Sequence, residues 1–223
     1  MGTPSPSRRF GANGGHAGPR PAALLAGLAL LTALALPLPG ASGADGASPP
    51  LTVLAAGDLR GEIKPCGCSP EGQLGGLPRR LSYLEQARRA PGPAPIVVDL
   101  GNNYPEPTEQ GRDKIELIRT LLGRDPPQAV LPGPAELALG STGLGGGLPY
   151  VVSNDALGQV FTHVRRVERA GRHVAIYGYL TPTAVYQGHE DFRLRAVDTA
   201  LLADLRARLA AAGDDAALLL FRG

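Results

Sequence analysis

The stretch Ile96–Asn102, which reads IVVDLGN, contains the clearest strand signal in the sequence. It begins as an apolar, β-branched run typical of a buried parallel strand, and an acidic residue and a glycine turn follow at once. A second short apolar run, Leu51–Ala56, is also typical of a buried strand and leads into Gly57 and Asp58. A helical pattern at Leu77–Arg89 separates the two runs. Strand, helix and strand in this order predict an α/β fold with a mainly parallel sheet.

The remaining elements continue this alternation. They are a helix near Asp113–Leu122, a third strand at Ala129–Leu131, a flexible glycine-rich connection at Gly140–Gly147, a strand at Tyr150–Ser153, a hairpin of Val160–Glu168 with His173–Gly178, a helix at Leu201–Ala212 ended by Gly213, and a last strand at Ala216–Phe221. The hairpin would make His163 and His173 cross-strand neighbours.

The spacing of leucines predicts which helix faces are buried. In the helix Leu77–Arg89 these are Leu77, Leu81 and Leu84, and the charged residues, Arg80 among them, are expected to face water. In the helix Leu201–Ala212 they are Leu201, Leu202, Leu205 and Leu209, while Asp204, Arg206 and Arg208 are expected on the solvated face.

Composition sets limits on the class of protein. The 223 residues are 43% hydrophobic, enough for one domain with a core, and aromatic residues are only 4%. Residues 1–44 contain three arginines and no acid, so the rest of the chain holds 19 basic and 20 acidic residues, a formal net charge of −1. This near-neutral balance lacks the basic surface that binding to a nucleic acid polymer requires.

Residues 1–44 are typical of a signal peptide. A positively charged segment precedes the apolar run Ala22–Leu36, and Pro37 and small residues follow it. The run is shorter than the ~20 residues that span a bilayer, although an uncleaved anchor is the alternative. We therefore expect a periplasmic or extracellular protein without stable membrane insertion after cleavage. Residues 45–50 would form a polar leader, and residues 51–223 the domain.

Three loops follow the predicted strands and are the natural place for a site. They are Gly57–Gly76, Gly101–Pro107 and Pro132–Glu136. Because function gathers at the carboxyl ends of parallel strands, we expect Asp58, Asn102 and Pro134–Glu136 to lie together at one end of the sheet.

The order of these loops resembles the calcineurin-like metallophosphoesterases, in particular the periplasmic 5'-nucleotidases and UDP-sugar hydrolases. That family has the motifs D-x-H, D-x-G-D and G-N-H-E after its strands. The matching stretches here are Asp58-Leu59-Arg60, Asp99-Leu100-Gly101-Asn102 and Gly133-Pro134-Ala135-Glu136. The resemblance implies a layered α/β sandwich, of which residues 51–223 would be the N-terminal two-thirds.

A narrower resemblance lies in the first loop. Pro65-Cys66-Gly67-Cys68, followed by Gly75–Arg80, is similar to a P-C-G-C branch of the superfamily that includes selenoproteins. This similarity indicates a fold rather than a function.

The resemblance implies a divalent metal centre, but most of its ligands are replaced. Two-metal hydrolysis needs several carboxylate and imidazole ligands around ions about 3.5–4 Å apart. Asp58 is retained and Asn102 is a weak, neutral ligand, whereas Arg60 stands where the family has a histidine. Pro134 and Ala135 replace the Asn–His pair, and Phe221 or Arg222 occupies the place of a later histidine.

Arg60 and the two cysteines each allow more than one interpretation. Arg60 can pair with Asp58 in the vacated metal site, or it can bind the phosphate of a small phosphorylated ligand. Cys66 and Cys68 can form a redox-active pair, a thiolate metal site or a merely structural loop.

Three hypotheses about function follow. The first is an exported metallophosphoesterase-like protein whose degenerate site leaves it catalytically impaired or a binding protein. The second is an active phosphoester or nucleotide hydrolase, and the third is a thiol redox or thiolate-metal protein that uses Cys66 and Cys68. The short C-terminal side predicts an open sheet edge, which a partner protein would cover unless the chain is a truncated reading frame.

Overall fold

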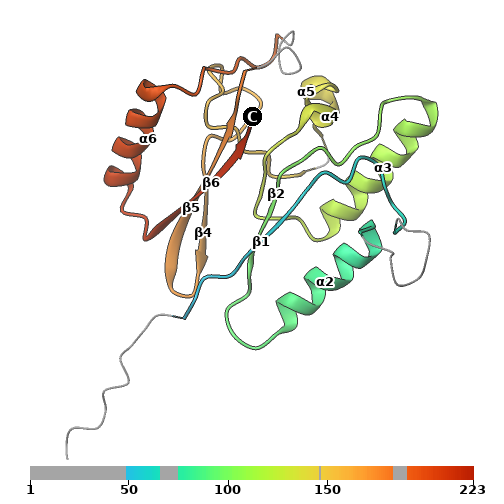
Figure 1. Cartoon of the computed structure of the whole chain (residues 1–223), viewed down its shortest axis with the longest axis horizontal. Coiled ribbons are helices and arrows are strands. Elements are labelled where there is room, and N and C mark those ends of the chain that lie inside the picture. Colours follow the sequence, from blue (N-terminus) through green and yellow to red (C-terminus); the bar gives the residue numbers. More distant parts are fainter. Residues whose placement is uncertain (1–48, 66–74, 146, 183–189) are drawn as a thin grey trace, which may run out of the picture. The chain divides into compact units, whose positions relative to one another are not determined.

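Two three-stranded sheets organise the residues that this computed structural model describes, which are 49–65, 75–145, 147–182 and 190–223 (Figure 1). The first sheet contains parallel strands in the order β1 (Val53–Ala56), β2 (Ile96–Asp99) and β3 (Ala129–Val130). In the second sheet, β4 (Arg165–Arg169) is antiparallel to β5 (Arg172–Leu180), which is parallel to β6 (Ala216–Arg222). The α/β prediction is confirmed, but the second sheet is mixed rather than parallel.

Tyr150–Ser153, predicted as a strand, is an extended segment that joins the sheets. Tyr150 bridges to Val130 of β3 in parallel, and the amide of Ser153 donates to the carbonyl of Gly178 in β5 over 2.6 Å. The segment changes partner along its length, from Val130 through Thr162 to Gly178, so only single bridges form.

Helix bounds follow capping residues. The helices are α2 (Leu77–Arg89), α3 (Glu109–Arg124), α4 (Pro134–Leu137), α5 (Gly140–Gly143) and α6 (Thr199–Ala212). α3 begins earlier than predicted because the Thr108 hydroxyl caps it, and α6 likewise begins after the Asp198 carboxylate. Gly213 ends α6 with φ 66°, as expected for a left-handed C-terminal glycine. The supposed flexible connection Gly140–Gly147 contains the short helix α5.

Side-chain alternation along β5 separates two layers of core. Val174, Ile176 and Leu180 face the first sheet, whereas Tyr177 and Tyr179 face α6. The helices α2 and α3 lie on the side of the first sheet that faces away from the second sheet. The layers are therefore α2 and α3, the first sheet, the second sheet and α6 (Figure 1). The expected layered sandwich is therefore present.

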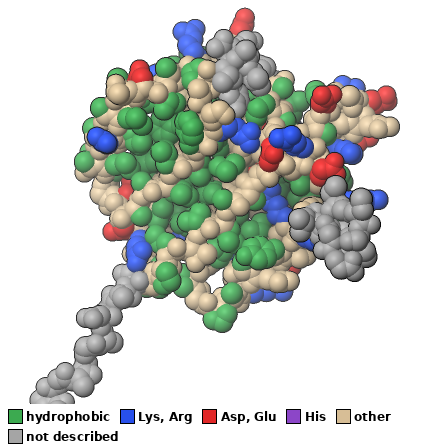
Figure 2. Space-filling model, in the orientation of Figure 1, with side chains coloured by type: hydrophobic (Ala, Val, Ile, Leu, Met, Phe, Trp, Pro, Cys, Tyr) green, Lys and Arg blue, Asp and Glu red, His purple; other side chains and the backbone are tan. Residues whose placement is uncertain are grey.

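The strands β1 and β6 are each an edge strand of their sheet. β1 is half-exposed rather than buried, because it has a neighbour on one side only. Leu219 and Phe221 of β6 and Val53 of β1 are exposed, and hydrophobic side chains gather over this region in Figure 2.

Three predictions about side-chain positions are wrong. Arg80 of α2 is mostly buried, since it lies on the same helical stripe as Leu77 and Leu84. Leu202 is exposed because its neighbour Leu201 occupies the buried side of α6. His163 lies before β4, and the residue opposite His173 is Glu168.

Several predictions concern segments outside the described residues. These are the signal peptide 1–44, the leader up to residue 48, and the cysteines Cys66 and Cys68. Among the described helices, none is long and apolar enough to cross a membrane.

Candidate functional site

The loops after β1 and β2 lie side by side. The amide of Asp58 donates to the carbonyl of Gly101 over 2.7 Å, and the amide of Arg60 donates to the carbonyl of Asn102 over 3.0 Å. The amide of Gly61 continues the series to Asn103 over 2.8 Å. These bonds extend the parallel pairing past the strand ends, which confirms the expected proximity of Asp58 and Asn102.

The backbone of these loops is held in left-handed conformations. Asp58 (φ 58°), Arg60 (φ 48°) and Asn102 (φ 59°) are non-glycine residues with positive φ. Such a conformation costs about 1–2 kcal/mol at each residue and persists only where the surroundings impose it. Strain gathered in two touching loops marks this end of the sheet as the candidate site.

Two glycines allow the third loop to approach. A Cβ atom on Gly101 would lie 2.4 Å from the amide nitrogen of Gly133, and one on Gly133 would lie 2.5 Å from that of Asn102. Any side chain at either position would force the loops apart.

Glu136 of α4 ties the second and third loops together. Its Oε2 accepts from the amides of Asn102 over 2.6 Å and Gly133 over 2.9 Å, and its Oε1 accepts from Asn103 over 2.7 Å. The side chain is 1% exposed, and burial raises the pKa of Glu136 although these bonds oppose the rise. Glu136 therefore positions Asn102 from behind and is turned away from the surface site.

Asp58 has donors at both carboxylate oxygens. Oδ1 accepts a 2.5 Å hydrogen bond from Asn102 Nδ2, and Oδ2 lies 3.1 Å from Arg60 Nη2. Arg222 Nη2, at the end of β6, is 3.9 Å from Oδ1. The hydrogen bond from Asn102, and then the one from Arg60, hold the pKa of Asp58 below its usual value. The carboxylate is thus an ion paired with neighbouring side chains.

A buried ion pair lies beneath this cluster. Asp99, at the end of β2, pairs with Arg80 of α2, and its Oδ1 accepts from the amide of Gly101 and the side chain of Asn103. The Asp99 side chain is 1% exposed and that of Arg80 13%. Asp99 therefore acts as an anchor for the turn that carries Asn102.

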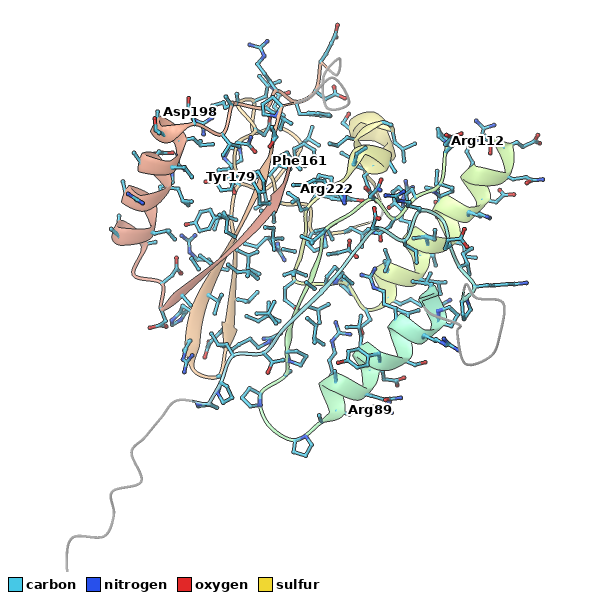
Figure 3. The ribbon with its side chains drawn as sticks, viewed as in Figure 1. Arg89, Arg112, Phe161, Tyr179, Asp198 and Arg222 are labelled. Carbon is cyan, nitrogen blue, oxygen red and sulfur yellow. The ribbon has the colours of Figure 1, made fainter. Side chains whose placement is uncertain are left out.

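A hollow of about 290 Å³ opens beside Asp58. Its walls are Ala55, Ala56, Gly57 and Leu100, and Arg222 closes one side. Figure 3 labels Arg222 where the end of β6 approaches β1 and β2. The site thus combines two guanidinium groups with a small apolar wall.

Known structures share this fold. The 5'-nucleotidase precursor of Thermus thermophilus aligns with a TM-score of 0.62 at 20% identity over 77% of this chain. The NAD nucleotidase of Haemophilus influenzae aligns with a TM-score of 0.60 at 17% identity, again over 77%. The chain has the 5'-nucleotidase fold. The sulfate thiohydrolase SoxB of Thermus thermophilus also shares this fold, with a TM-score of 0.55 at 14% identity over 78% of the chain.

Within the 5'-nucleotidase fold this chain corresponds to part of each neighbour. It spans 37% of the Thermus nucleotidase, 34% of the NAD nucleotidase and 44% of SoxB. No protein-family model matches the sequence, and no curated protein matches it. The similarity therefore concerns the fold, and the site must be judged on its own residues.

Sequence reasoning missed two arginines of this site. Arg80 lies three residues after Leu77 and four before Leu84, so helical spacing places its guanidinium on the buried face of the helix. A buried cation needs an acidic partner, and this spacing is the signal that could have predicted one. For Arg222 the sequence indicates only that it occupies a position where the family has a metal ligand. Its approach to Asp58 depends on how the second sheet packs beside the first.

Proposed function

We propose that this chain is an exported relative of the 5'-nucleotidase-like phosphoesterases that binds a small phosphorylated ligand and does not hydrolyse it. The supporting observation is the state of Asp58, whose two oxygens face Asn102, Arg60 and Arg222. The resemblance implies metal ions beside Asp58, and the contacts of this carboxylate with side chains of the chain itself support a site without them.

The donors around Asp58 do not suit a two-metal centre. Arg60 and Arg222 are permanent cations, and the amide nitrogen of Asn102 points at the carboxylate. A unit positive charge about 4 Å from a divalent ion costs about 2 kcal/mol in water and about 8 kcal/mol at an effective dielectric constant of 20. The described residues include no group of three or more His, Cys, Asp or Glu that could hold a metal ion.

The same residues suit an anion. Asp58, Arg60 and Arg222 together carry a formal charge of +1. The Arg60 side chain is 70% exposed, so its planar guanidinium can turn from Asp58 to a phosphate and bind two of its oxygens. The hollow lined by Ala55 and Leu100 would receive the organic part of the ligand.

Export is part of the proposal and rests on the signal-like residues 1–44. Mass spectrometry of the mature N-terminus from native cells tests it, since an intact Met1 would contradict cleavage.

The first prediction concerns catalysis. With Mn²⁺, Zn²⁺ or Mg²⁺ supplied, we expect hydrolysis of an aryl phosphate and of a nucleotide to be no faster than for the Asp58→Ala variant. The physical reason is the loss of ligands and the gain of two cations next to Asp58. A spectrophotometric phosphate-release assay measures both rates.

Two outcomes would contradict this prediction in different ways. Turnover that disappears in Asp58→Ala would establish an active metal site. Turnover that disappears only in Cys66→Ser or Cys68→Ser would instead favour thiolate chemistry. As a positive control, Arg60→His combined with Asn102→Asp restores two ligand types and should raise Mn²⁺ affinity at least about tenfold.

The second prediction concerns binding. We expect phenyl phosphate to bind the full chain, and Arg60→Gln or Arg222→Gln to weaken binding about tenfold or more, because a hydrogen bond to a charged group contributes about 1.5–3 kcal/mol. Asp58→Asn should strengthen binding, since it removes the competing anion. Isothermal titration calorimetry measures these affinities.

The matched control is Arg89→Gln, which removes an exposed arginine at the C-terminal end of α2, outside the proposed site. Equal affinity in wild type, Arg60→Gln and Arg222→Gln would overturn the proposed anion site. Hydrolysis and binding are measured separately, so one prediction can fail while the other holds.

A further inference from the structure

A second hollow, of about 270 Å³, lies on the far side of the second sheet. It is bounded by the outer face of β5 and the last turns of α6, and it shares no lining residue with the hollow beside Asp58. Tyr179, labelled in Figure 3, lies on the face of β5 that packs against α6.

The sequence of α6 accounts for this space. Leu201 and Leu205 are buried against Tyr177 and Tyr179, and Leu209 continues the same stripe. The next position on that stripe is Ala212, whose single methyl group cannot fill the distance to the sheet. A space therefore remains between the C-terminal half of α6 and the tyrosines Tyr177 and Tyr179 of β5.

His163 is part of the wall of this hollow. Its Nε2 atom is buried and has no hydrogen-bond partner among the described residues, and His163 is one of the lining residues. A Cβ atom on Gly158 would lie 3.3 Å from the ring's Cε1, so the imidazole rests against this glycine. The imidazole therefore closes the hollow on this side, and its covered Nε2 atom is not open to a ligand.

The rim is charged but balanced. Arg166 pairs through Nε with both carboxylate oxygens of Asp214 at 3.2 Å, and Arg208 pairs through Nε with Asp204 at 2.9 Å. A guanidinium has five N–H donors, so both arginines retain donors for a ligand. Two arginines and two aspartates sum to zero, which tolerates one negative charge and disfavours the double charge of a phosphate monoester.

We propose that this hollow binds a small aromatic carboxylate. The ring would lie against Tyr177 and Tyr179, and the carboxylate would face Arg166 and Arg208 at the rim. An apolar cavity of about 150 Å³ holds benzene, so this larger hollow suits a bicyclic ring.

The probe is 2-naphthoate, titrated into the full chain by calorimetry and by ligand-observed NMR. We expect saturable binding that Ala212→Leu weakens at least tenfold, because the leucine fills the hollow. Ala210→Leu is the matched control, since Ala210 is exposed on the same helix turn and does not line the hollow, and it should bind as wild type does. Arg208→Gln should weaken 2-naphthoate at least fivefold more than neutral 2-naphthamide.

Thermal unfolding of each variant keeps the test interpretable. Ala212→Leu should unfold no earlier than wild type, so loss of binding would report a filled hollow rather than a damaged helix. The inference is overturned if wild type shows no saturable binding, if Ala212→Leu binds as tightly as Ala210→Leu, or if Arg60→Gln weakens 2-naphthoate as much as it weakens phenyl phosphate.

Discussion

Arg80→Met is expected to lower the free energy of unfolding by about 3–5 kcal/mol, because it leaves the carboxylate of Asp99 buried without its cation. Methionine retains most of the apolar stem of Arg80, so the loss reports charge rather than packing. Urea denaturation followed by circular dichroism measures this change. The loss should be large since Asp99 is 1% exposed and water cannot replace the guanidinium.

The control and the second variant separate this ion pair from other effects. Arg89→Met lies on the same helix, but its pair with Glu85 is exposed, so the expected change is within about 0.5 kcal/mol. Adding Asp99→Asn to Arg80→Met should restore part of the stability, because asparagine is neutral and can still accept from the amide of Gly101. Equal losses in Arg80→Met and Arg89→Met would contradict the role assigned to the pair.

Glu136→Ala is expected to cost at least about 3 kcal/mol, since it removes the acceptor of three backbone amides. Glu136→Gln should cost less, about 1–3 kcal/mol. Its amide oxygen can still accept from Asn102 and Gly133, but its NH₂ group would face the amide of Asn103. The order of stability wild type, Gln, Ala is therefore the result to look for in urea denaturation.

The same substitution should disturb the surface site. Asn102 holds its left-handed conformation while its amide is bound by Glu136, and release of that amide should detach its side chain from Asp58. Phenyl phosphate affinity should then change in Glu136→Ala at temperatures where the variant is folded, and change less in Glu136→Gln, which can keep the bond to the Asn102 amide. Glu85→Ala, an exposed control on α2, should alter neither stability nor affinity. A Glu136→Ala variant as stable as Glu85→Ala would show that water satisfies the three amides.

Much of the chain's local structure could be predicted because it depends on near neighbours in the sequence. The helix Leu77–Arg89 and the turn at Ala170–Arg172 follow from helical spacing and from a glycine that tolerates positive φ. The half-exposed state of β1 could not be predicted. An apolar run of this kind is buried only if strands pair on both sides, and β1 has β2 alone.

The order of strands and loops in the sequence is enough to predict that the loops of Asp58, Asn102 and Glu136 lie at one edge, because each follows a strand of one parallel sheet. The contacts that these side chains make depend on the tertiary structure. Contacts over long sequence separations turned Glu136 toward backbone amides, placed Arg222 beside Asp58 and drew Arg80 onto Asp99. The hollow under α6 has the same origin. Ala212 is an ordinary helix residue in the sequence, and it leaves a space only because β5 lies opposite it at a distance that Leu201 and Leu205 set.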